Sequence, residues 1–305
     1  MSLSLFVIQA LNGFQYGVLL FLLAAGLTLV FGIMNFVNLA HGSLYMLGAY
    51  LGAAVYSTSG SFALAGVAAV IGTLVIGIAI ERTTLRAFYA RDHLYQVLAT
   101  VGLILFFNEV ARILWGSSPI YMRAPQGFTA AINLIGIPYP SYRFLVIAVG
   151  LLVAAGLYVL IHHTRIGMLT RASAANLRMV SVLGVNVRLL NTVLFGLGAA
   201  LAGLAGVMAA PILAVQPGMG DNVIITVLVI IVVGGIGSIR GAFFGALIVG
   251  VVDTIGRVYL PILLSQVIER DAADAAGSAL ASMLIYLFMA LVLALKPQGL
   301  FPVVR

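Results

Sequence analysis

The sequence predicts an all-α protein, a polytopic transmembrane bundle of about eight to ten helical spans. Hydrophobic residues make up 63% of the 305 residues and charged residues only 8%, whereas a soluble domain carries about a quarter charged residues. The mean hydropathy is +1.20. The apolar residues also gather into stretches near the roughly 20 residues that a helix needs to cross a membrane.

Nine such stretches follow one another, separated by polar gaps, at about 5–31, 39–57, 61–80, 95–115, 144–162, 189–213, 223–237, 240–260 and 278–295. The seventh is short and runs into the glycine cluster 234–237. We expect it to be tilted, broken or re-entrant, which requires that protein or water cover its backbone. No linker or soluble region interrupts the pattern, so a single transmembrane domain is predicted over residues 1–305.

The placement of arginine predicts the orientation of the bundle. The segment 163–188 contains four arginines and no carboxylate, and the loop 81–94 contains three arginines. The loop 261–277 instead has three acidic residues and one arginine. Because cytoplasmic loops carry the excess of basic residues, the first two are expected inside and the third outside. Nine crossings would leave the C-terminus cytoplasmic and the N-terminus external, whereas a tenth would move the N-terminus inside.

The net charge of +7 does not indicate nucleic-acid binding. The basic residues lie in short gaps between apolar runs, whereas a nucleic-acid footprint clusters on one exposed face. Membrane lipid is the expected surrounding partner. The absence of cysteine excludes disulfides, thiol catalysis and thiolate metal sites, and we assign no catalytic or metal-binding residue.

Small residues recur at helical spacing in two stretches. One stripe comprises Gly237, Gly241 and Gly245, and the other comprises Gly196, Ala199, Gly203, Gly206 and Ala210. Transmembrane helices associate through close backbone approach at small residues. The stripes therefore predict packing faces rather than ligand sites.

Two ion pairs are expected inside the spans. Glu109 and Arg112 are three residues apart, and Asp253 and Arg257 are four apart, so the members of each pair share a helix face. An unpaired charge at the bilayer centre costs about 2.5 to 3.5 kcal/mol on insertion scales. We interpret the pairs as charge compensation that permits insertion, with a proton or ion relay as the alternative.

The second span begins with a polar face. Asn38, His41 and Tyr45 fall at i, i+3 and i+7, which places them on one side of a helix. An amide, an imidazole and a phenol offer neutral hydrogen bonds to a polar solute, so these residues are candidates for the substrate pathway. In the alternative, Asn38 and His41 bridge to a neighbouring helix or cap the helix start.

The segment 163–188 predicts a short amphipathic helix over about 168–183, on the cytoplasmic surface. Helical spacing relates Leu169, Ala172, Asn176, Met179 and Leu183. Arg171 and Arg178 share an adjacent face, and Gly184 stands at the expected C-cap. Such a helix can bind anionic lipid or a protein. The abundance of alanine favours a protein, because interfacial anchors usually carry larger apolar residues or tryptophan.

Three segments resemble the inner-membrane permeases of branched-chain amino-acid ABC importers. VNLAHGSLYMLGAY is similar to the family's NFAHG-type signature, TRIGMLTRASAANLRMVSVLGVN to its cytoplasmic loop, and VVGGIGSIRGAFFGALIVG to its glycine-rich motif. The closing KPQGLFP is also similar, and the order and spacing agree along nearly the whole chain. The first motif favours the NFAHG-bearing member of the usual pair of permeases.

The resemblance implies a bacterial inner-membrane complex of two homologous permeases, two cytoplasmic ATP-binding subunits and a periplasmic solute-binding protein. It implies no cofactor for this chain, because the partner subunits bind ATP. The segment 163–188 then becomes the coupling helix that docks on an ATPase, and the family's pattern carries over to Arg165, Gly167, Arg171, Ala172, Asn176 and Gly184. Two residues depart from that pattern: Met168 replaces a basic residue, and Arg240 replaces a common proline. Family members carry branched-chain and other amino acids, amides, urea and aromatic acids, so the motifs leave the solute open.

Two other functions compete with this interpretation. A self-sufficient secondary carrier would need coupling charges in the membrane, and the chain offers only the two self-paired sets. An intramembrane enzyme would need a catalytic motif, and neither HExxH nor GxSxG occurs. The chain also lacks a GxxxxGK[ST] phosphate loop, so any ATP chemistry must come from a partner.

Overall fold

The computed structural model describes residues 3–34, 36–134 and 136–301, and confirms an all-α polytopic bundle. The elements are α1 (Leu3–Met34), α2 (His41–Ser59), α3 (Phe62–Thr83), the 3-10 turn η1 (Leu85–Phe88), α4 (His93–Trp115), β1 (Ala131–Leu134), β2 (Ile137–Pro140), α5 (Ser141–His163), α6 (Arg165–Val182), α7 (Val187–Ala209), α8 (Met219–Gly234), α9 (Ile239–Leu264) and α10 (Arg270–Leu295). Seven described helices are long and apolar enough to cross a membrane, namely α1, α3, α4, α5, α7, α9 and α10.

The core is formed by α1 and α7, around which the other helices pack. In each of these two helices 83% of the most apolar window is buried, against 17–22% in α3, α4, α5, α9 and α10. Glycine allows the other helices to pack closely on this core. A Cβ added to Gly48 of α2 would lie 2.3 Å from the Cα of Gly203 in α7. Similarly, a Cβ on Gly241 of α9 would lie 2.1 Å from the carbonyl oxygen of Gly234 in α8. Both predicted small-residue stripes are therefore packing faces.

Two further helices, α2 and α8, begin inside the bundle rather than at its surface. After α1 ends, the chain turns back without helical structure, and α2 starts at His41, whose Nε2 donates to the carbonyl oxygen of Leu23 in the middle of α1 (3.2 Å). The seventh apolar stretch forms α8, whose 16 residues span about 24 Å, less than the hydrocarbon core of about 30 Å. The helix is thus as short as its sequence indicates, and its tilted, broken or re-entrant path through the membrane stays a prediction. The starts of α2 and α8 touch, because Gly42 faces Gly220.

Several predicted boundaries were wrong where polar residues lie within helices. α10 begins at Arg270, eight residues before the predicted start, because Asp271 and Asp274 belong to its first turns. α9 continues to Leu264 through Pro261, which packs directly against Gly277 of α10. The short antiparallel hairpin of β1 and β2 was not predicted; it pairs Ala131 with Pro140 through Leu134 with Ile137.

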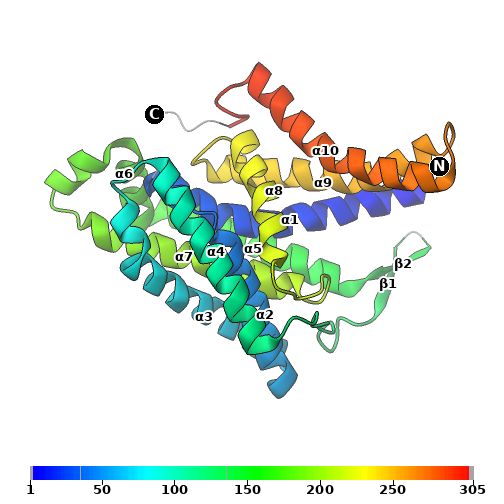
Figure 1. Ribbon diagram of the computed structural model, residues 1–305, viewed down its shortest axis with the longest axis horizontal. Helices are drawn as coiled ribbons and strands as arrows, with labels where there is room; N and C mark the ends of the chain where they lie inside the picture. The colour runs from blue at the N-terminus through cyan, green and yellow to red at the C-terminus, as the bar shows by residue number, and fades with distance from the viewer. Residues whose placement is uncertain (1–2, 35, 135, 302–305) are drawn as a thin grey trace.

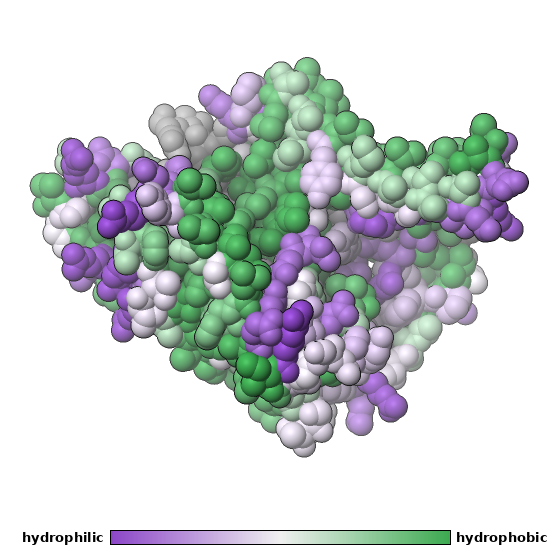
Figure 2. Space-filling view, viewed as in Figure 1, coloured by the Kyte–Doolittle hydropathy of each residue, from purple (hydrophilic) through white to green (hydrophobic). Residues whose placement is uncertain are grey.

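The two ends of the molecule differ in what they carry. Figure 1 shows α6 at the left end, with the N-terminus and the β1–β2 hairpin at the right. Arg86, which follows α3, bonds Thr192 near the start of α7, so the two arginine-rich segments lie at the same end. That arrangement is the one required if both are cytoplasmic. Figure 2 shows hydrophilic residues toward both ends and in a band across the middle of this face, with hydrophobic residues over much of the remaining surface.

Candidate functional site

The arginine-bearing segment 163–188 is fixed where it leaves the membrane-spanning helix α5. Thr164 caps α6, and its Oγ1 accepts a hydrogen bond from the backbone N–H of Gly167 (3.1 Å). A Cβ on Gly167 would lie 2.2 Å from the carbonyl oxygen of Ile161. Only glycine fits there, and the tight contact holds α6 against the end of α5. The neighbouring Arg165 is exposed.

α6 is not the single straight helix that the spacing predicts. Asn176 has φ −156° and ψ 91°, values that break the helix in two. Its Oδ1 accepts a hydrogen bond from the backbone N–H of Met179 (2.9 Å), as in an N-cap. The predicted continuous face from Leu169 to Leu183 is therefore wrong. Asparagine side chains compete with the helix for neighbouring backbone groups, and here that competition prevails.

The segment exposes a mixed basic and apolar surface. Arg171, Ala172 and Arg178 are exposed. Leu183 is the C-cap of α6, one residue before the predicted position, and Gly184 follows it with φ 86°, the left-handed conformation common just past a helix end. The half after Asn176 also exposes large apolar side chains, namely Leu177, Met179, Val182 and Leu183. The sequence argument that the abundance of alanine favours a protein partner over lipid did not take these larger apolar side chains into account.

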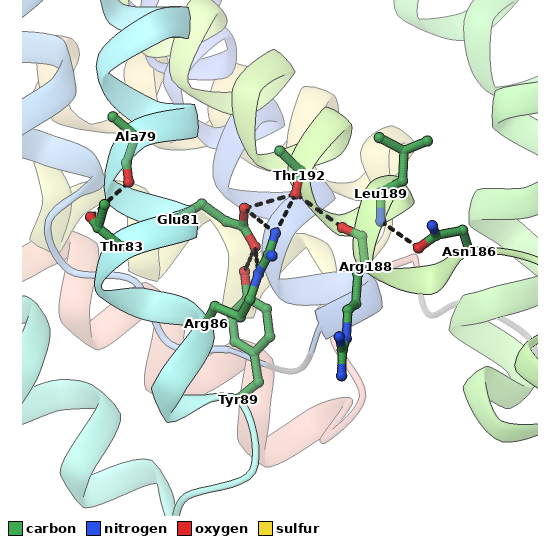
Figure 3. Close-up of polar contacts among 9 residues, drawn as sticks. All are labelled: Ala79, Glu81, Thr83, Arg86, Tyr89, Asn186, Arg188, Leu189 and Thr192. Carbon is green, nitrogen blue, oxygen red and sulfur yellow. Dashed lines mark hydrogen bonds and ion pairs between the residues drawn. The ribbon is translucent and has the colours of Figure 1, made fainter.

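A buried carboxylate that the sequence reasoning missed joins α3 to α7 (Figure 3). Glu81 is fully buried and pairs with Arg86 at 3.1 Å. It also accepts hydrogen bonds from the hydroxyls of Thr192 (2.8 Å) and Tyr89 (2.9 Å). Burial and then the Glu81 carboxylate raise the pKa of the Tyr89 phenol, so it stays a hydrogen-bond donor. Segment 163–188 is thus flanked by two packed contacts, Gly167 against α5 and, four residues beyond its end, Thr192 of α7 bonded to Glu81 of α3.

His41 and Tyr45 lie in the first two turns of α2, whereas Asn38 lies in the non-helical segment before it, so the prediction that all three share one helix face is wrong for Asn38. Asn38, His41 and Tyr45 are each at most 1% exposed. His41 makes the bridge to α1 that was the structural alternative, whereas Ala40 occupies the N-cap position and no side chain caps α2. The Asn38 amide and the Tyr45 hydroxyl have no hydrogen-bond partner within the described residues. Their contact with a solute stays a prediction.

A polar face that the sequence reasoning did not identify lies where the end of α4 approaches the start of α8. The predicted pair of Glu109 and Arg112 is confirmed at 2.7 Å, and its side chains are 61% and 53% exposed. Beside it, the Asn108 amide donates to Asp221 Oδ2 (3.1 Å). These four residues form the α4–α8 polar face, and Figure 2 shows hydrophilic surface in this region. The second predicted pair, Asp253 with Arg257, is confirmed at 2.9 Å.

Comparison with known families decides what kind of protein carries this arrangement. The model of the branched-chain amino acid transport system permease component matches residues 9–294. The chain belongs to this permease family. The permease is accordingly a transport component rather than an enzyme, as the sequence motifs implied.

Curated relatives match the permease over most of its length. The high-affinity branched-chain amino acid transport system permease protein BraD of Pseudomonas aeruginosa is 29% identical, over 96% of this chain and 94% of its own. The corresponding LivH of Salmonella typhimurium is 30% identical, over 84% and 87%. The ribose import permease protein RbsC of Escherichia coli is 28% identical, over 75% and 71%. No solved structure matches the permease.

The two departures from the family pattern lie in different helices, Met168 in α6 and Arg240 in α9. Met168 is 55% exposed in the first half of α6. Arg240 lies in the first turn of α9, and its guanidinium is 5.8 Å from the ring centroid of Tyr158 in α5. The Arg240 Nη2 also lies 3.5 Å from His162 Nε2. The permease therefore gathers basic groups where α5, α6 and α9 meet.

Proposed function

We propose that this permease is the transmembrane subunit of an ATP-driven importer for branched-chain or related amino acids in a bacterial inner membrane. It forms the translocation pathway with a second homologous permease. Two cytoplasmic ATP-binding subunits supply the ATP chemistry, so the chain needs no cofactor, and a periplasmic solute-binding protein delivers the solute. The printed names of BraD and LivH support the substrate class, while the more distant ribose permease shows that related chains serve other solutes.

The surface of α6 is the observation that carries the ATPase assignment. Arginines and large apolar side chains are exposed together on it. Both ends of the segment are fixed, by Gly167 against α5 and by Thr192 bonded to Glu81. A segment fixed at both ends can pass a movement of the docked ATPase subunit on to the membrane helices α5 and α7. We assign Arg165, Gly167, Arg171, Ala172, Asn176 and Gly184 to this coupling unit.

Two substitutions separate docking on a protein from binding to lipid. If α6 seats in a groove of the ATPase, Ala172→Trp should dissociate or uncouple the ATPases, because the added bulk cannot fit. Arg178→Gln should weaken docking only modestly, since exposed ion pairs are worth roughly 0 to 1 kcal/mol. Co-purification of the ATPases and import in proteoliposomes measure both effects.

A lipid anchor predicts the reverse order. Tryptophan favours the membrane interface, and each arginine near an anionic surface contributes about 1 kcal/mol. Retention of both ATPases and full transport by Ala172→Trp would show that the coupling assignment is wrong.

The α4–α8 polar face is proposed to line the pathway. Charged side chains exposed to hydrocarbon are costly, so such a face normally meets protein or a water-filled cavity. In the assembled importer, a cysteine replacing Arg112 should react with a polar thiol reagent, whereas one replacing the exposed Leu152 of α5 should not. The absence of native cysteines makes the labelling specific. Equal protection of both positions would place the polar face away from the pathway.

Asn38, His41 and Tyr45 are proposed as a deeper part of the same pathway, reached when α2 and α8 move apart at Gly42 and Gly220. His41→Ala should then impair uptake while assembly and basal ATP hydrolysis persist. Loss of assembly would instead assign His41 to the bridge with Leu23 alone. Undiminished uptake would dismiss both roles.

A further inference from the structure

Two adjoining cavities open where α5, α6 and α9 meet, at the end of the molecule that carries α6. The larger, of about 340 Å³, includes His162, Arg171 and Arg240 in its lining. The smaller, of about 140 Å³, is mostly apolar and is lined in part by Phe21, Leu157, Tyr158, Phe243 and Phe244. Ile161, His162, Ile239 and Arg240 line both. The result is one groove, basic at one end and apolar at the other, which we call the α5–α9 groove.

The basic end is built from three separate helices. Arg171 comes from α6, Arg240 from α9 and His162 from the last turn of α5. His162 Nδ1 donates to the carbonyl oxygen of Tyr158 (3.0 Å), which leaves Nε2 to accept from Arg240 (3.5 Å). His162 also stacks on the Tyr158 ring, with centroids 4.4 Å apart. Arg240 is thereby held over an aromatic and imidazole platform.

These arginines lack a carboxylate partner among the described residues. None of the three ion pairs there includes Arg171 or Arg240, and no acidic residue lines either cavity. Helix stability does not account for Arg240, because a cation in the first turn opposes the helix dipole. The start of α9 adds further positive potential. The basic end thus suits an anion.

We propose that the α5–α9 groove binds an anionic phospholipid. The phosphate of the headgroup lies between Arg171 and Arg240, and an acyl chain follows the apolar cavity. The apolar continuation favours a lipid over a soluble anion or an acidic protein segment, because neither would use the aromatic lining. Basic pockets between transmembrane helices on the cytoplasmic side are suited to lipid headgroups. A bound phosphate would connect the coupling segment α6 to the membrane helix α9.

The purified full chain in detergent tests this directly, by native mass spectrometry with dioleoylphosphatidylglycerol and dioleoylphosphatidylcholine. The phosphatidylglycerol should bind preferentially. Arg171→Gln and Arg240→Gln should each weaken its binding about fivefold, and the double variant about thirtyfold. Arg240→Lys should keep most of the affinity for phosphatidylglycerol, because lysine retains the positive charge that attracts the phosphate. Arg178→Gln, on the same helix as Arg171 but outside the groove, is the matched control and should bind normally.

Other outcomes would overturn the lipid assignment. Equal binding of the two lipids, or equal weakening by Arg178→Gln, would mean that general surface charge attracts the lipid. Competition by glycerol 3-phosphate at the affinity of the lipid would identify a soluble-anion site. Loss of ATPase co-purification in Arg240→Gln with unchanged lipid binding would assign the groove to the ATPase. Because lipid binding is measured on the chain alone, it does not rest on the proposed importer.

Discussion

The break at Asn176 should control the shape of the coupling segment. Asn176→Ala removes the Oδ1 that accepts from Met179 N–H and that caps the second half of α6. Without this cap, the two halves should join into one straight helix and carry the exposed apolar cluster to a new position. Asn176→Asp and Asn176→Gly should keep the break, because aspartate caps as well as asparagine and glycine costs only a few tenths of a kcal/mol at this position.

The size of the effect follows from the cap. Loss of an N-cap side chain costs about 0.5 to 2 kcal/mol, and alanine gains up to about 0.7 kcal/mol over asparagine inside a helix. Together these terms favour the straight form by about 1 to 3 kcal/mol, a shift of roughly 5- to 150-fold in the population ratio.

Distances between spin labels on cysteines at positions 168 and 182 report the shape. A straight helix places these Cα atoms about 21 Å apart, and we expect the bend at Asn176 to bring them closer. The distance should lengthen in Asn176→Ala only, and import per ATP hydrolysed should fall in the same variant. An unchanged distance in Asn176→Ala would refute the capping argument. Coupling defects in all three variants would instead indicate that the amide itself contacts a partner.

Three further outcomes test the fold and its orientation. Glu81→Ala should lower the free energy of unfolding in a detergent titration by about 1 to 3 kcal/mol, because it leaves the Tyr89 hydroxyl without its acceptor. The Arg86 guanidinium also loses its partner, but its side chain is 37% exposed and water can solvate it. A neutral effect would show that the network contributes nothing. Gly48→Ala should destabilise the protein, because the new Cβ would lie 2.3 Å from a backbone atom of α7, whereas Gly66→Ala has open space and should not; equal effects would contradict the packing argument. In intact cells, an impermeant thiol reagent should label a cysteine at 274 but not one at 175, and the opposite result would reverse the topology.

The sequence by itself determined the class of the protein, the positions of its long apolar helices and the family. The hydropathy of a stretch depends only on its own residues, so a run of about 20 apolar residues predicts a membrane span without knowledge of the helices that pack against it. The glycine stripes and the pairs Glu109–Arg112 and Asp253–Arg257 were also predictable, because helical spacing alone places those residues on one face. Gly184 ends the coupling segment for a similarly local reason, its left-handed backbone.

The break at Asn176 shows where local reasoning ends. The N-cap bond and the helix propensity of this residue are each worth only about 1 kcal/mol, so spacing alone favoured the wrong form. The packed ends of α6 help decide between them: Gly167 fixes one end, and the Glu81 network fixes the chain beyond the other.

Only the tertiary structure decided which distant residues meet. Glu81 and Thr192 are 111 positions apart, and Asn108 and Asp221 are 113 apart. The groove likewise needs Arg171 and Arg240 from two helices that the sequence does not place side by side. Periodicity defines the faces of each helix, but the rotation and depth at which helices pack depend on small-residue contacts along the whole bundle. The same packing starts α2 and α8 inside the protein, where surrounding helices cover backbone that lipid could not solvate.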